Sequence, residues 1–114
     1  MREISYSIYR PAGNDTALVS GTDFSKEEKK IINDAIMEKH ANVEQVGFVN
    51  IDGKEELQMA GGEFCGNATR STAYHYLNGR PGRVEICVNG EDMIMAGVDS
   101  EGKFYYQAKQ KEGE

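Results

Sequence analysis

Short stretches with alternating apolar and polar residues run through the first half of the chain. Residues 2–9 alternate Ile and Tyr with Ser, which predicts a first strand, and residues 16–19 predict a second. Residues 44–51 and 55–59 predict a further pair of strands, and Asp52-Gly53 between them is typical of a hairpin turn. We therefore expect several short strands, of which the last two form a hairpin.

Two segments show helical spacing instead. Ser25 and Glu28 have the spacing of a capping box, in which each side chain bonds the other residue's backbone N–H group. The apolar residues behind them recur at helical intervals, which predicts a helix to about His40. A second helix is expected after the glycine-rich stretch 60–66, running to Leu77.

The last third of the chain predicts three more strands. They cover residues 83–89, 91–97 and 103–108, with turn residues between them. The whole chain thus holds roughly seven strands and two helices, and the helices interrupt the order of the strands. This pattern predicts a mixed α+β fold, with residues 1–114 as a single domain.

Composition narrows the classes of partner. The chain has 114 residues and a net charge of −6, without a basic run, which argues against a nucleic-acid or anionic-membrane surface. No apolar stretch approaches the ~20 residues that span a bilayer. The N-terminus carries Glu3 and does not resemble a signal peptide, so we expect a cytoplasmic protein. Its two cysteines, Cys65 and Cys87, are then expected to be free thiols.

Cys65 stands where the glycine-rich stretch enters the second predicted helix. The N–H groups and positive dipole at a helix N-terminus favour a thiolate. They can also receive a substrate carboxylate, with Gly66 allowing close approach and Asn67 adding an amide. This arrangement suits removal of the α-proton of an amino acid. On the local pattern alone, a buried and unreactive cysteine explains the sequence equally well.

Two other chemistries fit the sequence poorly. A Cys–His pair needs hydrogen-bond reach, yet His75 lies ten residues along the same predicted helix, ~15 Å away at ~1.5 Å per residue. His40 ends the other helix and would have to arrive through tertiary folding. Two cysteines and two histidines without paired spacing also do not predict a metal site.

A family resemblance is carried by three segments. The stretch Gly61–Thr69 resembles the first cysteine motif of the diaminopimelate epimerase superfamily, and Arg10–Asp15 resembles its first Gly-Asn loop. The run Val43–Phe48 is closer to the histidine racemase branch of that superfamily, and the similarity continues to Tyr105-Tyr106. The resemblance implies one lobe of a diaminopimelate epimerase-like fold, in which a mixed or antiparallel sheet wraps around a central helix.

The same resemblance implies a mechanism with two thiols and neither pyridoxal phosphate nor a metal. Cys65 matches the first catalytic cysteine, while Gly66 and Asn67 match the positions that receive the α-carboxylate. Asn14 matches a pocket asparagine, and Glu44 matches a pocket acid that recognises the amine or ring of the substrate. Histidine is the leading substrate, and diaminopimelate follows. Without the resemblance, Asn14 is a turn residue and Glu44 a solvated acid at a strand start.

In the resembling family, the second catalytic cysteine comes from a second, pseudo-symmetric lobe. Cys87 lies in an alternating strand segment, so we expect it to be packed and unable to replace that cysteine. The chain is therefore interpreted as the N-terminal lobe, whose partner is a second lobe. A homodimer that mimics two lobes and an amino-acid carboxylate-binding module without turnover are the alternatives.

Overall fold

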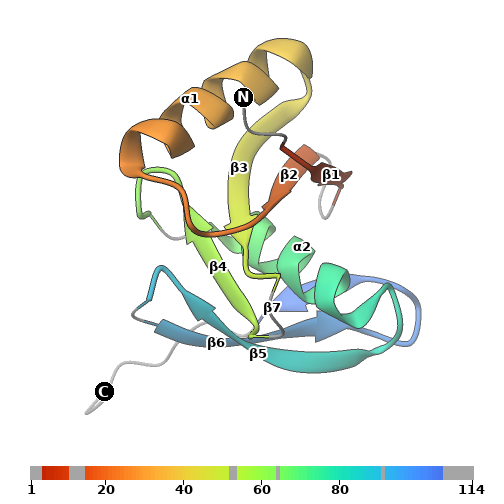
Figure 1. The fold of residues 1–114 in the computed structure, drawn as a ribbon. Coiled ribbons are helices and arrows are strands. Elements are labelled where there is room, and N and C mark those ends of the chain that lie inside the picture. The colour runs from red at the N-terminus through yellow and green to blue at the C-terminus, as the bar shows by residue number, and fades with distance from the viewer. Residues whose placement is uncertain (1–3, 11–14, 52–53, 64, 91, 107–114) are drawn as a thin grey trace.

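The computed structural model describes residues 4–10, 15–51, 54–63, 65–90 and 92–106, which form seven strands and two helices (Figure 1). In chain order the elements are β1 (Tyr6–Tyr9), β2 (Asp15–Ser20), α1 (Lys26–Lys39), β3 (Val43–Val49), β4 (Glu56–Met59), α2 (Gly66–Leu77), β5 (Gly82–Val88), β6 (Asp92–Val98) and β7 (Phe104–Tyr106). Neither helix within these residues has the length and apolarity that a membrane span requires.

All seven strands belong to one mixed sheet, and their order in the sheet is their order in the chain. β2 pairs with β3 and β4 with β5 in parallel, while the other neighbouring pairs are antiparallel. Parallel neighbours need a crossover connection, and α1 and α2 supply the two crossovers. β1 and β7 are the edges of the described sheet, which does not close into a barrel. The predicted mixed α+β fold is confirmed.

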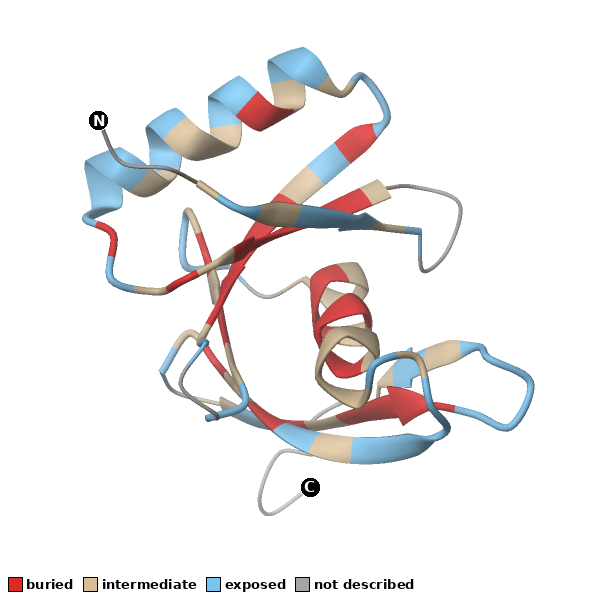
Figure 2. Cartoon of the chain, turned by 45° about the vertical axis from the view of Figure 1, so that its right-hand side comes forward, coloured by how far each residue is buried: buried red, intermediate tan, exposed pale blue. Residues whose placement is uncertain are grey.

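The sheet bends around α2, and α1 lies on the other side of it (Figure 1). α2 packs against six of the strands, from β2 to β7, while α1 packs chiefly against β3. In Figure 2 the buried residues lie on α2 and on the strands around it, whereas most of α1 is exposed. The position of α2 agrees with the central helix that the resemblance implied.

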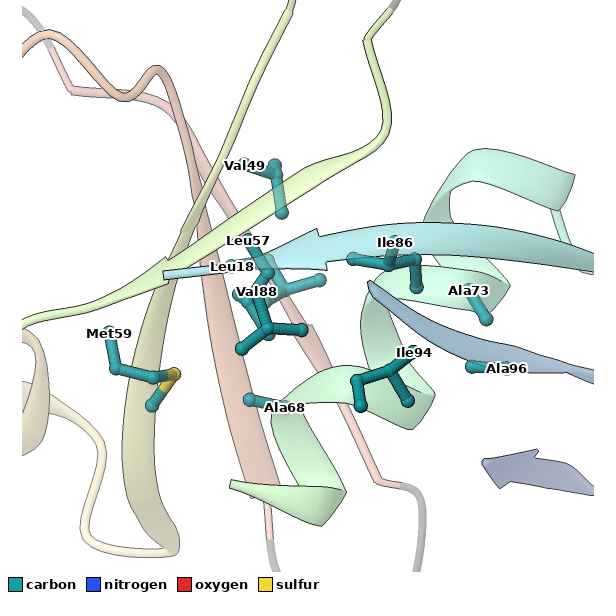
Figure 3. Packing of buried hydrophobic residues seen from close by; sticks show 10 residues of the cluster. All are labelled: Leu18, Val49, Leu57, Met59, Ala68, Ala73, Ile86, Val88, Ile94 and Ala96. Carbon is teal, nitrogen blue, oxygen red and sulfur yellow. The ribbon is translucent and has the colours of Figure 1, made fainter. Parts of the chain in front are cut away.

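Two hydrophobic clusters fill the two faces of the sheet. The α2-side core, shown in Figure 3, consists of Leu18, Val49, Leu57, Met59, Ala68, Ala73, Ile86, Val88, Ile94 and Ala96. The α1-side core consists of Ala17, Val19, Phe24, Ile36, Val43, Val46 and Phe48. Neighbouring residues of β2 divide between the two cores, as expected for a strand whose side chains alternate between faces.

α2 can occupy the centre of the bent sheet because its buried residues are small. They are Ala68, Thr69, Ser71, Thr72 and Ala73. The hydroxyls of Thr69 and Thr72 donate to the carbonyls four residues earlier, at 2.8 and 2.7 Å. These bonds keep two polar side chains satisfied inside an apolar environment. Bulkier residues on this helix would push the strands apart.

Most predicted elements are found within a few residues of their predicted bounds. The first strand was predicted too long, since β1 begins only at Tyr6 among the described residues. The hairpin pairing of β3 with β4 is confirmed by the register of Gly47 opposite Met59. Its predicted turn at Asp52-Gly53 lies outside the described residues.

Candidate functional site

Cys65 is the N-cap residue of α2. Its backbone is extended, with φ −137° and ψ 115°, and its carbonyl accepts hydrogen bonds from the N–H and hydroxyl groups of Thr69 at 3.0 and 2.8 Å. Its half-buried side chain packs against the α2-side core and makes no capping hydrogen bond. The thiol therefore lies at the N-terminus of α2 and is not used in a capping hydrogen bond.

The first turn of α2 has the properties of an anion-binding helix end. The leading N–H groups of an α-helix have no partner within the helix, and they carry the positive end of the dipole. The first turn, which includes Gly66 and Asn67, contains no acidic side chain, and Cys65 does not cap it. A helix end of this kind is suited to a carboxylate, and the binding of one beside the Cys65 thiol stays a prediction.

Gly66 is required by a close contact inside the chain. A Cβ atom built at Gly66 would lie 2.7 Å from a ring carbon of Tyr106 and 2.9 Å from its hydroxyl oxygen. That this glycine allows a ligand to approach stays a prediction; the structure shows that it allows Tyr106 of β7 to approach. The family resemblance reaches Tyr106, but nothing in the sequence indicated that its ring lies against Gly66.

Asn67 is bound by another residue of the same helix. The Nη1 group of Arg70 donates to Oδ1 of Asn67 at 3.2 Å. The guanidinium of Arg70 also lies over the ring of Tyr106, 4.9 Å from its centroid. One connected group at the start of α2 is therefore formed by Gly66, Asn67, Arg70 and Tyr106. Residues three apart on a helix are neighbours, so the spacing of Asn67 and Arg70 could have indicated their contact.

The loop before Cys65 is clamped by Asn89. Oδ1 of Asn89 accepts from the N–H of Met59 at 2.9 Å, and its Nδ2 donates to the carbonyls of Gly62 and Glu63 at 3.0 and 2.9 Å. Asn89 has a left-handed backbone, with φ 55°, in the turn from β5 to β6. The sequence predicted only a turn at Asn89-Gly90. Nothing in the local pattern indicated that its side chain crosses to the loop leading to Cys65.

Glu44 lies apart from this group in the chain, as the exposed second residue of β3. The register of β2 with β3 shifts here: Asp15 faces Val43 and Thr16 faces Gln45, which leaves Glu44 as the extra residue. Gln45 turns to the hydroxyl of Thr16. Within the described residues, no hydrogen bond or ion pair joins Glu44 to Cys65, Gly66 or Asn67.

Asn14 lies outside the described residues. Asp15, its neighbour in the chain, pairs with Val43 at the start of β3, one residue before Glu44. Asp15 also accepts a hydrogen bond from Nε of Arg10 at 2.7 Å. That exposed ion pair links the described residues on either side of the 11–14 segment.

Cys87 is placed on the other face of the sheet from Cys65. Its neighbours Ile86 and Val88 both belong to the α2-side core, so the side chain between them points to the opposite face. The prediction that Cys87 packs within a strand is confirmed in part, because the residue is half-buried on β5.

The two histidines hold β1 to the helices. Nε2 of His40 is hydrogen-bonded to the hydroxyl of Tyr6 at 2.9 Å, and Nδ1 of His75 to the hydroxyl of Tyr9 at 3.0 Å. Burial lowers the pKa of His75 from its ordinary value of 6.5 and raises the pKa of Tyr9. Neither histidine is hydrogen-bonded to a cysteine within the part of the chain that the structure describes.

Comparison with known proteins gives consistent matches. Residues 3–109 match the family model described as "Histidine racemase CntK N-terminal domain". A histidine racemase of Staphylococcus aureus is 43% identical over 77 residues, which cover 63% of this chain and 28% of that protein. A histidine racemase of Fusobacterium nucleatum is 45% identical over 64 residues, which cover 55% and 23%. The matched part thus spans about a quarter of each curated relative.

Proposed function

This chain belongs to the family of histidine racemase N-terminal domains, and from that premise we propose that it forms the Cys65-bearing part of an amino-acid racemase acting on histidine. The observation that carries the proposal concerns the first turn of α2. There, a thiol that caps nothing stands beside helix N–H groups that no acidic side chain of the first turn neutralises. Such a helix end binds a carboxylate and presents a base to the adjacent carbon.

In the proposed reaction the thiolate of Cys65 removes the α-proton of the bound amino acid. The electron pair of the broken C–H bond passes to the α-carbon and its carboxylate. A second thiol on the opposite face of the substrate then donates a proton to the same carbon, which inverts the centre. Cys65 ends as a thiol and the second group as a thiolate, so the reverse reaction exchanges their roles. The step needs no cofactor.

The helix end stabilises the charge that this reaction develops. Gly66 and Asn67 hold the α-carboxylate, over which the negative charge spreads when the α-proton leaves. Gly66 has no side chain to keep a carboxylate from the backbone N–H groups, and the ring of Tyr106 occupies the space that a Cβ atom would take. The same groups that bind the ground state therefore also favour the carbanion-like transition state.

The second thiol in this proposal comes from outside the described residues. Cys87 does not serve, because the sheet separates it from the α2-side core against which Cys65 packs. We assign the second thiol to a further lobe of the longer protein, and a second copy of this chain is the alternative. Glu44 and Asn14 are proposed to select the amine or ring of the substrate. Their support is the family match together with the pairing of Asp15 beside Glu44.

The test is exchange of the α-proton in D₂O, followed by NMR. The chain is incubated with L-histidine or with L,L-diaminopimelate, alone and with a separately expressed second lobe. Cys65→Ser is the test variant, and Cys87→Ser is the matched control. We expect the α-proton signal of histidine to be lost with the wild type and with Cys87→Ser. The rate of this exchange should fall by more than about 10³-fold with Cys65→Ser.

Each other outcome has a defined meaning. Exchange that Cys65→Ser leaves intact would overturn the assignment of the base. Preference for diaminopimelate would replace histidine as the substrate. Binding of histidine without exchange, even with the second lobe present, would make the chain a carboxylate-binding module.

A further inference from the structure

A charged side chain, that of Arg70, contacts Asn67, one of the two residues proposed to bind the carboxylate. Arg70 begins the second turn of α2, and its guanidinium contacts both Asn67 and Tyr106. Its Nε atom is buried and has no hydrogen-bond partner among the described residues. A buried guanidinium N–H without a partner costs free energy of folding. We therefore expect an interaction of Arg70 that offsets this cost.

The contact with Asn67 fixes which way its side-chain amide faces. A guanidinium only donates hydrogen bonds, so the atom of Asn67 that faces Arg70 is its oxygen, Oδ1. The Nδ2 group must then point away from Arg70. Among the described residues Nδ2 makes no hydrogen bond, which leaves both of its N–H groups for a ligand. Without Arg70 the amide could rotate and present its oxygen, which would repel a carboxylate.

The contact of Arg70 with Tyr106 holds the Tyr106 ring beside Gly66. The guanidinium lies 4.9 Å from the centroid of the Tyr106 ring, within the range of a cation–π contact. The same ring lies so close to Gly66 that a Cβ atom there would clash with it. Arg70 therefore links two residues that border the first N–H groups of α2, and it also adds positive charge near a bound anion.

We propose that Arg70 is a positioning residue, which holds the Asn67 amide with Nδ2 outward and Tyr106 against Gly66, and so prepares the start of α2 for a carboxylate. This inference rests on the proposed function for its ligand, but its structural part concerns the free chain. Arg70 touches no reacting atom in this arrangement. It acts through Asn67, Tyr106 and its charge.

The first test needs no ligand. NMR relaxation of the side-chain amide of ¹⁵N-labelled Asn67 is compared in the wild type, Arg70→Met, Arg70→Lys and Arg83→Met. Arg83 is an exposed arginine of β5 and serves as the matched control. We expect the Asn67 amide to lose its order in Arg70→Met, to regain part of it in Arg70→Lys, and to remain unchanged in Arg83→Met. An equally ordered amide in Arg70→Met, with the backbone spectrum intact, would overturn the proposal.

The second test measures binding of L-histidine, with imidazole as a probe that lacks the carboxylate. Arg70→Met should weaken histidine binding by about fivefold, the effect of roughly one hydrogen bond, and leave imidazole binding unchanged. Equal weakening of both probes would overturn the role at the carboxylate. If the wild type binds no histidine, with or without the second lobe, the proposed function fails. In that case the NMR relaxation of the Asn67 amide alone tests whether Arg70 positions this side chain.

Discussion

The two helices of this chain begin in opposite ways. At the start of α1, the side chains of Ser25 and Glu28 bond each other's N–H groups at 3.1 and 2.8 Å, and two acidic residues lie in the first turn. At the start of α2, Cys65 makes no side-chain cap and the first turn holds no acid. The first helix neutralises its own N-terminus, whereas the second leaves its N-terminus available.

Near their C-terminal ends the two helices share one feature, a histidine bonded to a tyrosine of β1. His40 follows α1 and bonds Tyr6, while His75 lies in the last turn of α2 and bonds Tyr9. Both tyrosines belong to β1, so this edge strand is attached to both helices. The helices also end differently, since the C-cap of α1 is the extended His40 and that of α2 the left-handed Asn78, yet both are attached to β1. The start of α2 without a side-chain cap is the feature on which the proposed carboxylate site rests.

The largest expected effect on stability is at the clamp that supports the start of α2. Asn89→Ala removes three hydrogen bonds and leaves an alanine at φ 55°. We expect it to lower the free energy of unfolding by about 3–4 kcal/mol in a urea titration. Asn78→Ala is the matched control, because Asn78 has the same φ without side-chain hydrogen bonds among the described residues. It should cost about 1 kcal/mol, and an equal loss in both variants would contradict the clamp.

The cap of α1 comes next in size. Ser25→Ala removes one half of the capping box and should lower the free energy of unfolding by about 1 kcal/mol. Because the start of α1 holds no proposed site residue, binding and exchange of histidine should remain as in the wild type. A Ser25→Ala variant that keeps its stability but loses histidine binding would reverse the roles that we assign to the two helix starts.

A smaller effect is expected on lowering the pH. Burial lowers the pKa of His75 in the folded chain below its ordinary value of 6.5, so below that pH the unfolded chain binds more protons. The stability that neutral His75 contributes is complete above pH 6.5 and is lost as the pH falls through the folded-state pKa. Urea titrations at pH 7.5 and pH 5 should show this loss in the wild type and in His40→Gln. They should show less of it in His75→Gln.

The smallest effect on stability is predicted for Cys65→Ser, although it abolishes the proposed chemistry. Serine is a favoured N-cap residue, whereas the thiol of Cys65 caps nothing. The free energy of unfolding should stay the same or rise by up to about 1 kcal/mol. Urea titration beside the exchange assay measures both properties on one sample. A clear loss of stability would mean that Cys65 is a packing residue of the core.

Much of the fold could be predicted because local interactions determine it. The capping box at Ser25 and the alternating strands are properties of residues only a few positions apart. The glycine-rich entry to α2 likewise marked Cys65, Gly66 and Asn67 as a helix start, which the structure confirms. Their roles in binding and catalysis remain a proposal, as do those of Glu44 and Asn14.

The tertiary structure decided the contacts between distant residues. Tyr9 and His75 are 66 positions apart, and Asn89 reaches carbonyls 26 and 27 positions earlier in the chain. Such contacts depend on strand register and on the path of the sheet around α2, and no local pattern encodes either. Local sequence was enough to identify the residues that begin the central helix. The folded sheet decided that Tyr106 covers Gly66 and that Cys87 faces away, because packing chooses which distant residues meet.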